Sequence, residues 1–163
     1  VAWTGTVCTN PPMVYISVRP ERYSYSILKE TKTFVINLTT EKLLKATDYC
    51  GVRSGRDVDK FRETGLTAIP GPVTGCPMVA ESPVNLECKV KEVKALGSHD
   101  MFLAEVVAVH VSEDYMEGNG RFRLNQTGLV AYSHGEYFSL GKNLGTFGYS
   151  VRKPAKKKGK HRR

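Results

Sequence analysis

The chain has 163 residues, of which 40% are hydrophobic and 25% are charged, and this composition is typical of a soluble globular domain. No run of about 18 apolar residues occurs, which excludes a membrane-spanning helix from the expected elements. The opening residues, VAWTGTVCTN, have no charged region followed by a long apolar run, so we expect no secretory signal there.

The net charge of +8 comes from the C-terminal end of the chain. Eight basic residues and no acidic one occur in the stretch RKPAKKKGKHRR (152–163), and the remainder is neutral. Such a tail is either an arm that binds nucleic acid or anionic surfaces, or a solvated, disordered end. We favour the second interpretation, because the body shows no helix-turn-helix or zinc-finger pattern, and we expect no nucleic-acid partner.

Four cysteines occur at wide spacings, and no two of them form a CxxC pair: Cys8, Cys50, Cys76 and Cys88. This spacing argues against a zinc site or a redox-active dithiol, and we expect no bound metal. Without a secretory signal, we expect free thiols and a cytoplasmic protein.

The first half of the chain alternates strand and helix patterns. The segment PMVYISV (12–18) is rich in β-formers and is bounded by prolines, so it predicts a strand. A short helix is expected at 25–30 with Ser24 as its N-cap, and a second strand at 33–38. Helices are expected at 40–51, capped by Thr40, and at 54–65.

The second half indicates an irregular loop followed by long strands. Residues 66–83 are rich in proline and glycine and predict a loop. Residues 85–96 alternate, with Leu86, Cys88 and Val90 on one face and Glu87, Lys89 and Lys91 on the other. Residues 101–114 form a nearly continuous apolar strand suited to burial on both faces. The residues GSHD (97–100) between them predict a hairpin turn. Many strands with few short helices indicate a mainly β domain, a barrel or a sandwich.

Two neighbouring segments combine donors that suit a phosphate and a ring. In VRPERYSYS, Arg19 and Arg22 are planar cations that bind phosphates well, and Ser24 lies at a predicted helix start, where an anion is favoured. In WTGT, Trp3 offers an aromatic plane, and Gly5 permits close approach of the backbone. The structural alternatives are a solvated turn whose arginines pair with nearby glutamates and an ordinary strand end.

Three further segments carry polar or aromatic side chains. The segment DYCGVRSGRDVDKF (48–61) interleaves basic and acidic residues, and a surface helix with salt bridges explains it well. His99 lies in the predicted hairpin turn, where a histidine is usually solvated but where barrels also carry function. His134, with Tyr132 and Tyr137 nearby, is as consistent with a structural role as with a functional one.

Taken together, five segments resemble the flavoredoxin branch of the flavin reductase-like, FMN-binding split-barrel family. They are AWTGTVCTNPPMVYISVRP, FVIN, DYCGVRSGRDVDKF, ECKV…LGSHDMFLAEV and YSHGEYFSLGKNLGTFGYSVRK. The resemblance covers nearly all of residues 1–153, and it leaves a basic tail at 154–163 outside the domain. It implies a Greek-key split β-barrel that forms a homodimer, with one FMN bound non-covalently in each subunit near the dimer interface. Family members usually carry a strand before this region, so we expect a leading strand to be absent from this sequence.

The resemblance also implies roles for particular residues. Residues expected to line the flavin ring are Trp3, Thr4, Gly5 and Thr6. Residues expected to hold the phosphate and ribityl chain are Ser17, Arg19, Arg22, Ser24 and Tyr25, with Ser54 and Lys60 also near the phosphate. The segment GSHDMF resembles the Gly-Asp-His motif of flavin reductases, with Ser98 replacing the aspartate. His99 is therefore expected on the nicotinamide or acceptor side of the flavin, as the catalytic residue.

Three functions follow from these observations. The first is an FMN-dependent oxidoreductase that passes electrons from NAD(P)H or a protein donor to an acceptor. The second is a flavin-binding electron carrier that acts only with partner proteins and has no NAD(P)H site. The third is an interaction protein without redox chemistry, whose basic tail binds nucleic acid.

Overall fold

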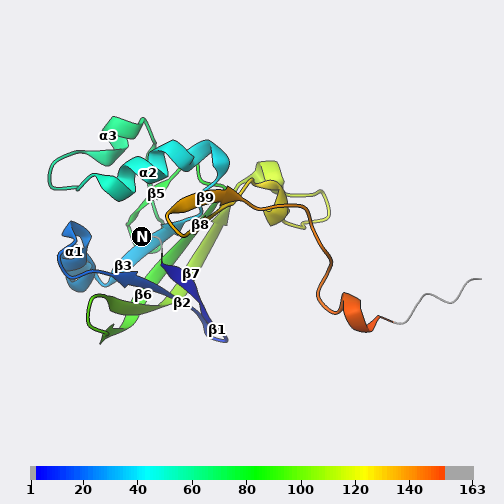
Figure 1. Cartoon of the computed structure of the whole chain (residues 1–163), viewed down its shortest axis with the longest axis horizontal. Coiled ribbons are helices and arrows are strands. Elements are labelled where there is room, and N and C mark those ends of the chain that lie inside the picture. The colour runs from blue at the N-terminus through cyan, green and yellow to red at the C-terminus, as the bar shows by residue number, and fades with distance from the viewer. Residues whose placement is uncertain (1–2, 153–163) are drawn as a thin grey trace, which may run out of the picture.

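The computed structural model describes residues 3–152, so the predicted basic tail lies outside the described residues. One five-stranded antiparallel sheet, with strand order β1-β2-β7-β6-β3, forms the body (Figure 1). Its strands are β1 (Thr4–Thr9), β2 (Pro12–Val18), β3 (Thr33–Asn37), β6 (Val84–Ala95) and β7 (Asp100–Val111). Two small hairpins join it: β4 (Ala68–Pro70) with β5 (Pro77–Val79), and β8 (Val130–Ser133) with β9 (Glu136–Ser139).

Three short helices surround the sheet: α1 (Tyr23–Thr31), α2 (Leu44–Val52) and α3 (Lys60–Thr64). Single 3-10 turns occur at Glu41–Leu43, Glu113–Tyr115, Leu124–Gln126 and Tyr149–Val151. None of the helices within residues 3–152 is long and apolar enough to cross a bilayer. The prediction of a mainly β domain with few short helices is confirmed.

The predicted strands agree with the structure more closely than the predicted helices. The strand at 12–18 matches β2, and a hairpin joins β6 to β7 as expected, closed by a hydrogen bond from the amide of Leu96 to the carbonyl of His99. The helix predicted at 40–51 begins with a 3-10 turn, and Thr40 makes no capping hydrogen bond, because its buried backbone pairs with Leu129 instead. The helix predicted at 54–65 forms only over α3, because the Asp59 carboxylate caps it by accepting from the amide of Arg62.

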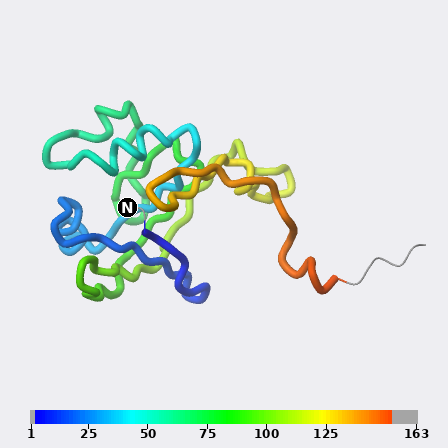
Figure 2. Tube along the Cα trace, viewed as in Figure 1, coloured from blue at the N-terminus to red at the C-terminus, as the bar shows by residue number. Residues whose placement is uncertain are grey.

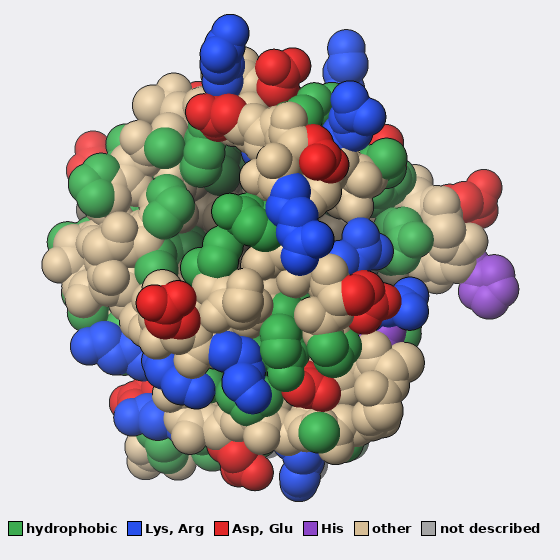
Figure 3. Space-filling model, turned by 90° about the vertical axis from the view of Figure 1, so that its left-hand side faces the viewer, with side chains coloured by type: hydrophobic (Ala, Val, Ile, Leu, Met, Phe, Trp, Pro, Cys, Tyr) green, Lys and Arg blue, Asp and Glu red, His purple; other side chains and the backbone are tan. Residues whose placement is uncertain are grey.

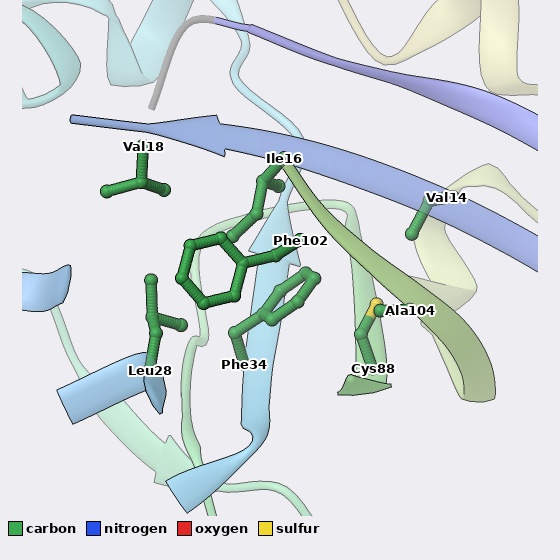
Figure 4. Close-up of a cluster of buried hydrophobic side chains, with 8 residues drawn as sticks. All are labelled: Val14, Ile16, Val18, Leu28, Phe34, Cys88, Phe102 and Ala104. Atoms are coloured by element: carbon green, nitrogen blue, oxygen red, sulfur yellow. The ribbon is translucent and has the colours of Figure 1, made fainter. Parts of the chain in front are cut away.

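The core lies between the sheet and α1 (Figure 4). Alternate residues of β2 point into it, as expected for a strand with one buried face. Figure 4 shows Leu28 of α1 and Phe34 of β3 directed toward Phe102 of β7, whose side chain is fully buried. The remaining members of this cluster are Val14, Ile16, Val18, Cys88 and Ala104. The core therefore fixes α1 against the sheet.

The prediction of free thiols is confirmed. All four cysteines are unpaired, as expected. Burial, and then the neighbouring Glu87 carboxylate, raise the pKa of the Cys88 thiol to about 12, so this thiol stays protonated.

The strand expected to be buried on both faces exposes Val109 and Val111, because no described element of this chain covers that end of β7.

Glu87 was predicted on the charged face of its strand, and its burial was not predicted. Its side chain is 0% exposed, because the loop between β4 and β5 folds over it. The carboxylate accepts hydrogen bonds from the amides of Val73 and Thr74, from the Thr74 hydroxyl at 2.7 Å, and pairs with His110 Nε2 at 2.7 Å. A Cβ on Gly71 would lie 2.4 Å from Glu87 Oε2, so this loop position requires glycine.

The Glu87 contacts anchor the loop through a charged group. Burial by itself would raise the pKa of Glu87, but the hydrogen bonds from Thr74, His110 and the two amides outweigh it and hold the pKa at about 2. Because this pKa lies below the ordinary value, the ionised carboxylate stabilises the fold above about pH 4.5. The contribution is lost as the pH falls toward 2.

We expect Glu87→Gln to lower the free energy of unfolding by about 3 kcal/mol at pH 7. The substitution removes the buried negative charge that the hydrogen bonds from the β4–β5 loop and His110 stabilise. The difference from wild type should shrink as the pH falls from 4.5 to 2. Urea unfolding at several pH values measures it. Glu92→Gln, on the exposed side of the same strand, is the matched control. A pH-independent difference, or an equal loss in the control, would contradict this account.

Candidate functional site

Antiparallel pairing brings the predicted site segments to one end of the sheet. Val18, the last residue of β2, lies opposite Asp100, the first residue of β7. The β6–β7 turn, the start of β1 and the chain leading into α1 therefore meet at this end. Residues that are far apart in the sequence, including Trp3, Ser17, Tyr25 and His99, become neighbours there.

Trp3 and His99 form a stacked pair at this end. Their ring centroids are 4.5 Å apart, and the planes differ by 26°. The amide of Ser17 donates to the carbonyl of Trp3 at 3.0 Å, which ties the start of the chain to the end of β2. Trp3 remains 57% exposed, so its ring offers apolar surface to a ligand. Trp3, predicted to line the flavin ring, is thus adjacent to His99, predicted as the catalytic residue.

Two of the other predicted ring-side residues, Thr4 and Gly5, have structural partners of their own. The Thr4 hydroxyl donates to the carbonyl of Tyr15 at 2.8 Å. A Cβ on Gly5 would lie 2.7 Å from the Tyr15 ring, so close strand pairing already requires glycine at this position. Thr6 is exposed on β1.

His99 is held by its neighbour in the turn. The Ser98 hydroxyl lies 3.0 Å from Nδ1 of His99. Among the described residues, Nε2 of His99 has no hydrogen-bond partner, so it is available to a ligand. The serine that replaces the aspartate of the reductase motif thus contacts the imidazole without adding a charge.

Tyr25 and Asp100 join α1 to the hairpin. The Tyr25 hydroxyl donates to Oδ2 of Asp100 at 2.6 Å, and the Tyr25 ring packs edge-on against Phe102. Asp100 is only 8% exposed. The hydrogen bond to Asp100, followed by burial and the charge of the carboxylate, raises the pKa of Tyr25. Sequence reasoning missed Asp100, although it directly follows His99, because its burial is not visible in the sequence.

The start of α1 has no cap. The predicted cap, Ser24, is wrong: the N-cap position is Arg22, with extended backbone, and no side chain accepts from the first-turn amides. No acidic residue occurs in the first turn. The reason is that residues 19–22 form a turn closed by the Arg22 amide and the Arg19 carbonyl, so the helix begins two residues early. The amide of Tyr25 donates to the carbonyl of Arg22, whereas the amides of Tyr23 and Ser24 have no partner among the described residues. These two amides and the helix dipole favour an anion at this point.

The two predicted phosphate arginines differ in their surroundings. Arg19 Nε pairs with Oε1 of Glu21 at 2.6 Å, and both side chains are about half exposed. Arg22 is exposed and, among the described residues, takes part in no ion pair. Of the two, only Arg22 presents an uncompensated guanidinium at the helix start.

The loop that precedes α3 approaches the same helix start. The Tyr23 ring contacts Gly55, where a Cβ would lie 3.0 Å from the ring, and the Arg56 guanidinium lies 5.8 Å from the ring centroid. The Ser54 hydroxyl accepts from the amide of Arg56, whereas Lys60 Nζ donates to the carbonyl of Cys50. Arg56 is thus a candidate that the sequence pattern alone did not separate from the surrounding surface charges.

The remaining aromatic segment has a structural explanation. His134 and Gly135 adopt positive φ and form the two-residue turn of the β8–β9 hairpin. The Tyr137 hydroxyl donates to Oδ1 of Asp48 at 3.0 Å, which joins this hairpin to α2. Within residues 3–152, no group of three or more potential metal ligands occurs.

The site forms an open surface. A hollow of about 630 Å³ lies between the last turns of α1, β3 and the β4–β5 loop, and none of its lining residues is a predicted flavin ligand. On the face shown in Figure 3, Lys and Arg side chains are interleaved with Asp and Glu and do not gather into one basic patch. Recognition of an anion therefore depends on local donors such as the start of α1.

These features define the class of protein. The open, mainly antiparallel sheet with few short helices is the split-barrel fold of flavin reductases. Residues 1–141 match the model of the flavin reductase like domain, so the chain belongs to the flavin reductase-like family. The predicted resemblance is confirmed.

Solved structures agree with this assignment. Flavoredoxin of Desulfovibrio vulgaris (Miyazaki F) is 29% identical and superposes with a TM-score of 0.84, over 93% of this chain and 82% of that one. Flavoredoxin from Methanosarcina acetivorans is 28% identical, with a TM-score of 0.82 over 92% and 82% of the two chains. An FMN-binding protein from Thermus thermophilus is 26% identical, with a TM-score of 0.75 over 88% and 78%.

Relatives found by sequence extend the comparison. An uncharacterized protein of Aeropyrum pernix is 35% identical over 72% of this chain, and the chain spans only 45% of that relative's length. RutF of Escherichia coli, named an FMN reductase (NADH), is 23% identical over 64% of this chain and 62% of its own length.

We expect Tyr25→Phe to lower the thermal midpoint by a few degrees, because it leaves the buried Asp100 carboxylate without its donor. Since the pKa of Tyr25 is raised, the wild-type advantage should persist up to pH 10 and decline above it. Melting followed by circular dichroism measures both effects. Tyr23→Phe is the control, because no hydrogen bond of the Tyr23 hydroxyl occurs among the described residues. An unchanged midpoint in Tyr25→Phe would refute the coupling.

Proposed function

We propose that this chain binds FMN at the end of the sheet where Trp3, His99 and the start of α1 meet. FMN held there would supply the redox chemistry by which the protein would pass electrons from NAD(P)H or a protein donor to an acceptor. One observation carries the proposal: an uncapped helix start with an unpaired arginine lies at the same sheet end as an exposed, stacked aromatic pair. A phosphate and a planar ring are the two parts of FMN that these features fit.

The phosphate part rests on charge. FMN carries a phosphate dianion, which free first-turn amides, the helix dipole and a guanidinium each stabilise. Arg22 stands at the N-cap of α1, and no carboxylate in the first turn opposes an anion. Ser24 in the first turn and Arg56 beside Tyr23 are further donors near this point. The Arg19 guanidinium is held by Glu21, so we assign the main phosphate contact to Arg22.

The ring part rests on Trp3 and His99. Trp3 supplies an exposed aromatic plane, and Ser17 fixes its backbone. When bound, FMN supplies the redox chemistry, because its ring takes up and releases electrons together with protons. The chain's own contribution is to orient the ring and to hold a proton at His99 Nε2. When the Ser98 hydroxyl donates to Nδ1, the neutral imidazole carries its proton on Nε2.

We further propose that the protein works as a homodimer in the reducing environment of the cytoplasm. The proposed ligands Trp3 and Arg22 are exposed on the surface of the single chain, where a second subunit can contribute to the same site. The four unpaired cysteines support a reducing compartment. The name FMN reductase (NADH) borne by the relative RutF supports FMN as the flavin and a nicotinamide as the donor.

A flavin-binding carrier without its own NAD(P)H site is the second candidate. The hollow beside β3 and a smaller one beside Thr40 are both lined by residues other than His99, so neither of them is a nicotinamide slot next to this histidine.

We expect Arg22→Ala to weaken FMN binding at least about tenfold, because it removes a charge-assisted contact to the phosphate. Riboflavin, which lacks the phosphate, should bind wild type and variant equally. Quenching of flavin fluorescence measures both affinities. Arg19→Ala is the matched control and should have the smaller effect, since Glu21 already engages that guanidinium. Wild-type protein that binds neither flavin would overturn the proposed function, and equal losses for both ligands would overturn the phosphate assignment.

We expect anaerobic NADH or NADPH to bleach the visible absorbance of the FMN-loaded protein. His99→Phe should slow this reduction by roughly 10- to 100-fold while FMN affinity is retained, because phenylalanine keeps the stack on Trp3 but removes the ring nitrogens. Stopped-flow absorbance measures the rate. No bleaching in wild type would favour the carrier, and an unchanged rate in the variant would remove His99 from the chemistry.

A further inference from the structure

We propose that residues 140–151, the C-terminal arm, pack on the body of a second copy of this chain. The inference rests on the homodimer proposed above and names the segment that holds the two subunits together. It does not depend on flavin binding.

The C-terminal arm separates from its own body directly after β9. Its last hydrogen bond to the body joins the amide of Leu140 to the carbonyl of Leu129 at 3.3 Å. From residue 141 to residue 152, the hydrogen bonds of the described chain are internal to the arm, such as Gly145 amide to Asn143 Oδ1. Figures 1 and 2 show this segment, in orange to red, leaving the body and running away from it. The body therefore does not support the arm.

The C-terminal arm is nevertheless apolar and has a defined shape. Leu144 is 85% exposed, and Phe147 is fully exposed. Its other exposed apolar side chains are Leu140, Tyr149 and Val151. The Tyr149 ring packs against Gly145, where a Cβ would lie 2.8 Å from the ring, and a 3-10 turn follows. An apolar segment that has a defined conformation, and that the rest of its own chain leaves exposed, indicates an interaction surface.

The area of the C-terminal arm suits a dimer. Five large apolar side chains expose roughly 500–700 Å² per arm, given about 150–250 Å² for each aromatic residue. Two arms related by a twofold axis would bury this surface twice, on the order of 1,000–1,400 Å² before the receiving surface is counted, and this reaches the range of stable interfaces.

The same chain also exposes apolar residues on its body, which favours a second copy over another partner. Val109 and Val111 of β7 and Leu124 are exposed there. A twofold dimer requires that one chain carry both the arm and the surface that receives it, and we infer that these residues belong to the receiving surface. Lys142 and Arg152 are the charged residues of 140–152, and no acidic residue occurs there, so the arm offers mainly apolar contact. An arm folded onto its own body, or onto an unrelated protein, is the alternative to be tested.

The test compares the full-length chain with Leu144→Asp/Phe147→Asp by sedimentation velocity over a dilution series. Wild type should sediment at twice the chain mass of 18.1 kDa, and the double variant at the chain mass itself, with the dimer dissociation constant raised at least 100-fold. Val52→Asp, a similarly exposed apolar position on α2, is the control and should remain dimeric. Circular dichroism and the urea midpoint establish that all three are folded, which we expect because the arm lies outside the core.

Each outcome decides between the proposals. A monomeric wild type overturns both the arm proposal and the homodimer, whether or not FMN binds. A double variant that stays dimeric overturns the arm proposal alone. Dissociation of Val52→Asp as well would move the interface off the arm and also overturn it. FMN titration of each species reports flavin binding separately, so its failure is distinguished from failure of the dimer.

Discussion

The register of β2 against β7 is the constraint on which the rest of this structure depends. Val18 lies opposite Asp100, so the side chains that alternate into the core on β2 meet Phe102 and Ala104 on β7. A slip of one residue would turn the apolar face of β2 away from the core. It would also separate Asp100 from Tyr25 and displace the Trp3–His99 stack. The same pairing thus organises both the core and the proposed site.

The start of α1 shows a compromise between stability and binding. A side-chain cap stabilises a helix by about 1 kcal/mol, and Arg22 provides none. The helix tolerates this because Leu28 anchors it in the core and Tyr25 bonds to Asp100. The amides of Tyr23 and Ser24 are left for a ligand, and an anion bound there would supply the acceptors that the sequence omits. The contacts of Leu28 and Tyr25 hold α1 in place, and the N-terminal end of the helix keeps its hydrogen-bond donors.

Local sequence signals predicted the parts of the fold that depend on local physics. Alternation in PMVYISV identified β2, and GSHD identified the hairpin turn, because strand period and turn chemistry are visible over a few residues. The burial of Glu87 was not visible, since it depends on a loop more than ten residues away. The cap of α1 was placed two residues late, because the turn at 19–22 is held by backbone bonds alone. The pairing of Tyr25 with Asp100 joins residues 75 positions apart, which no local pattern encodes.

The sheet edges explain why a partner subunit would be held by an arm. At β1, the register shifts between Thr6 and Cys8, and such a bulge disfavours pairing with another strand. At β3, the Asn37 side chain accepts from the amide of Val79, and Thr33 contacts Cys76, so the β4–β5 segment lies against this edge. With both edges protected, strand addition is a poor route to association. Contact between side chains remains, and the C-terminal arm and the outer face of β7 carry the exposed apolar groups that it requires.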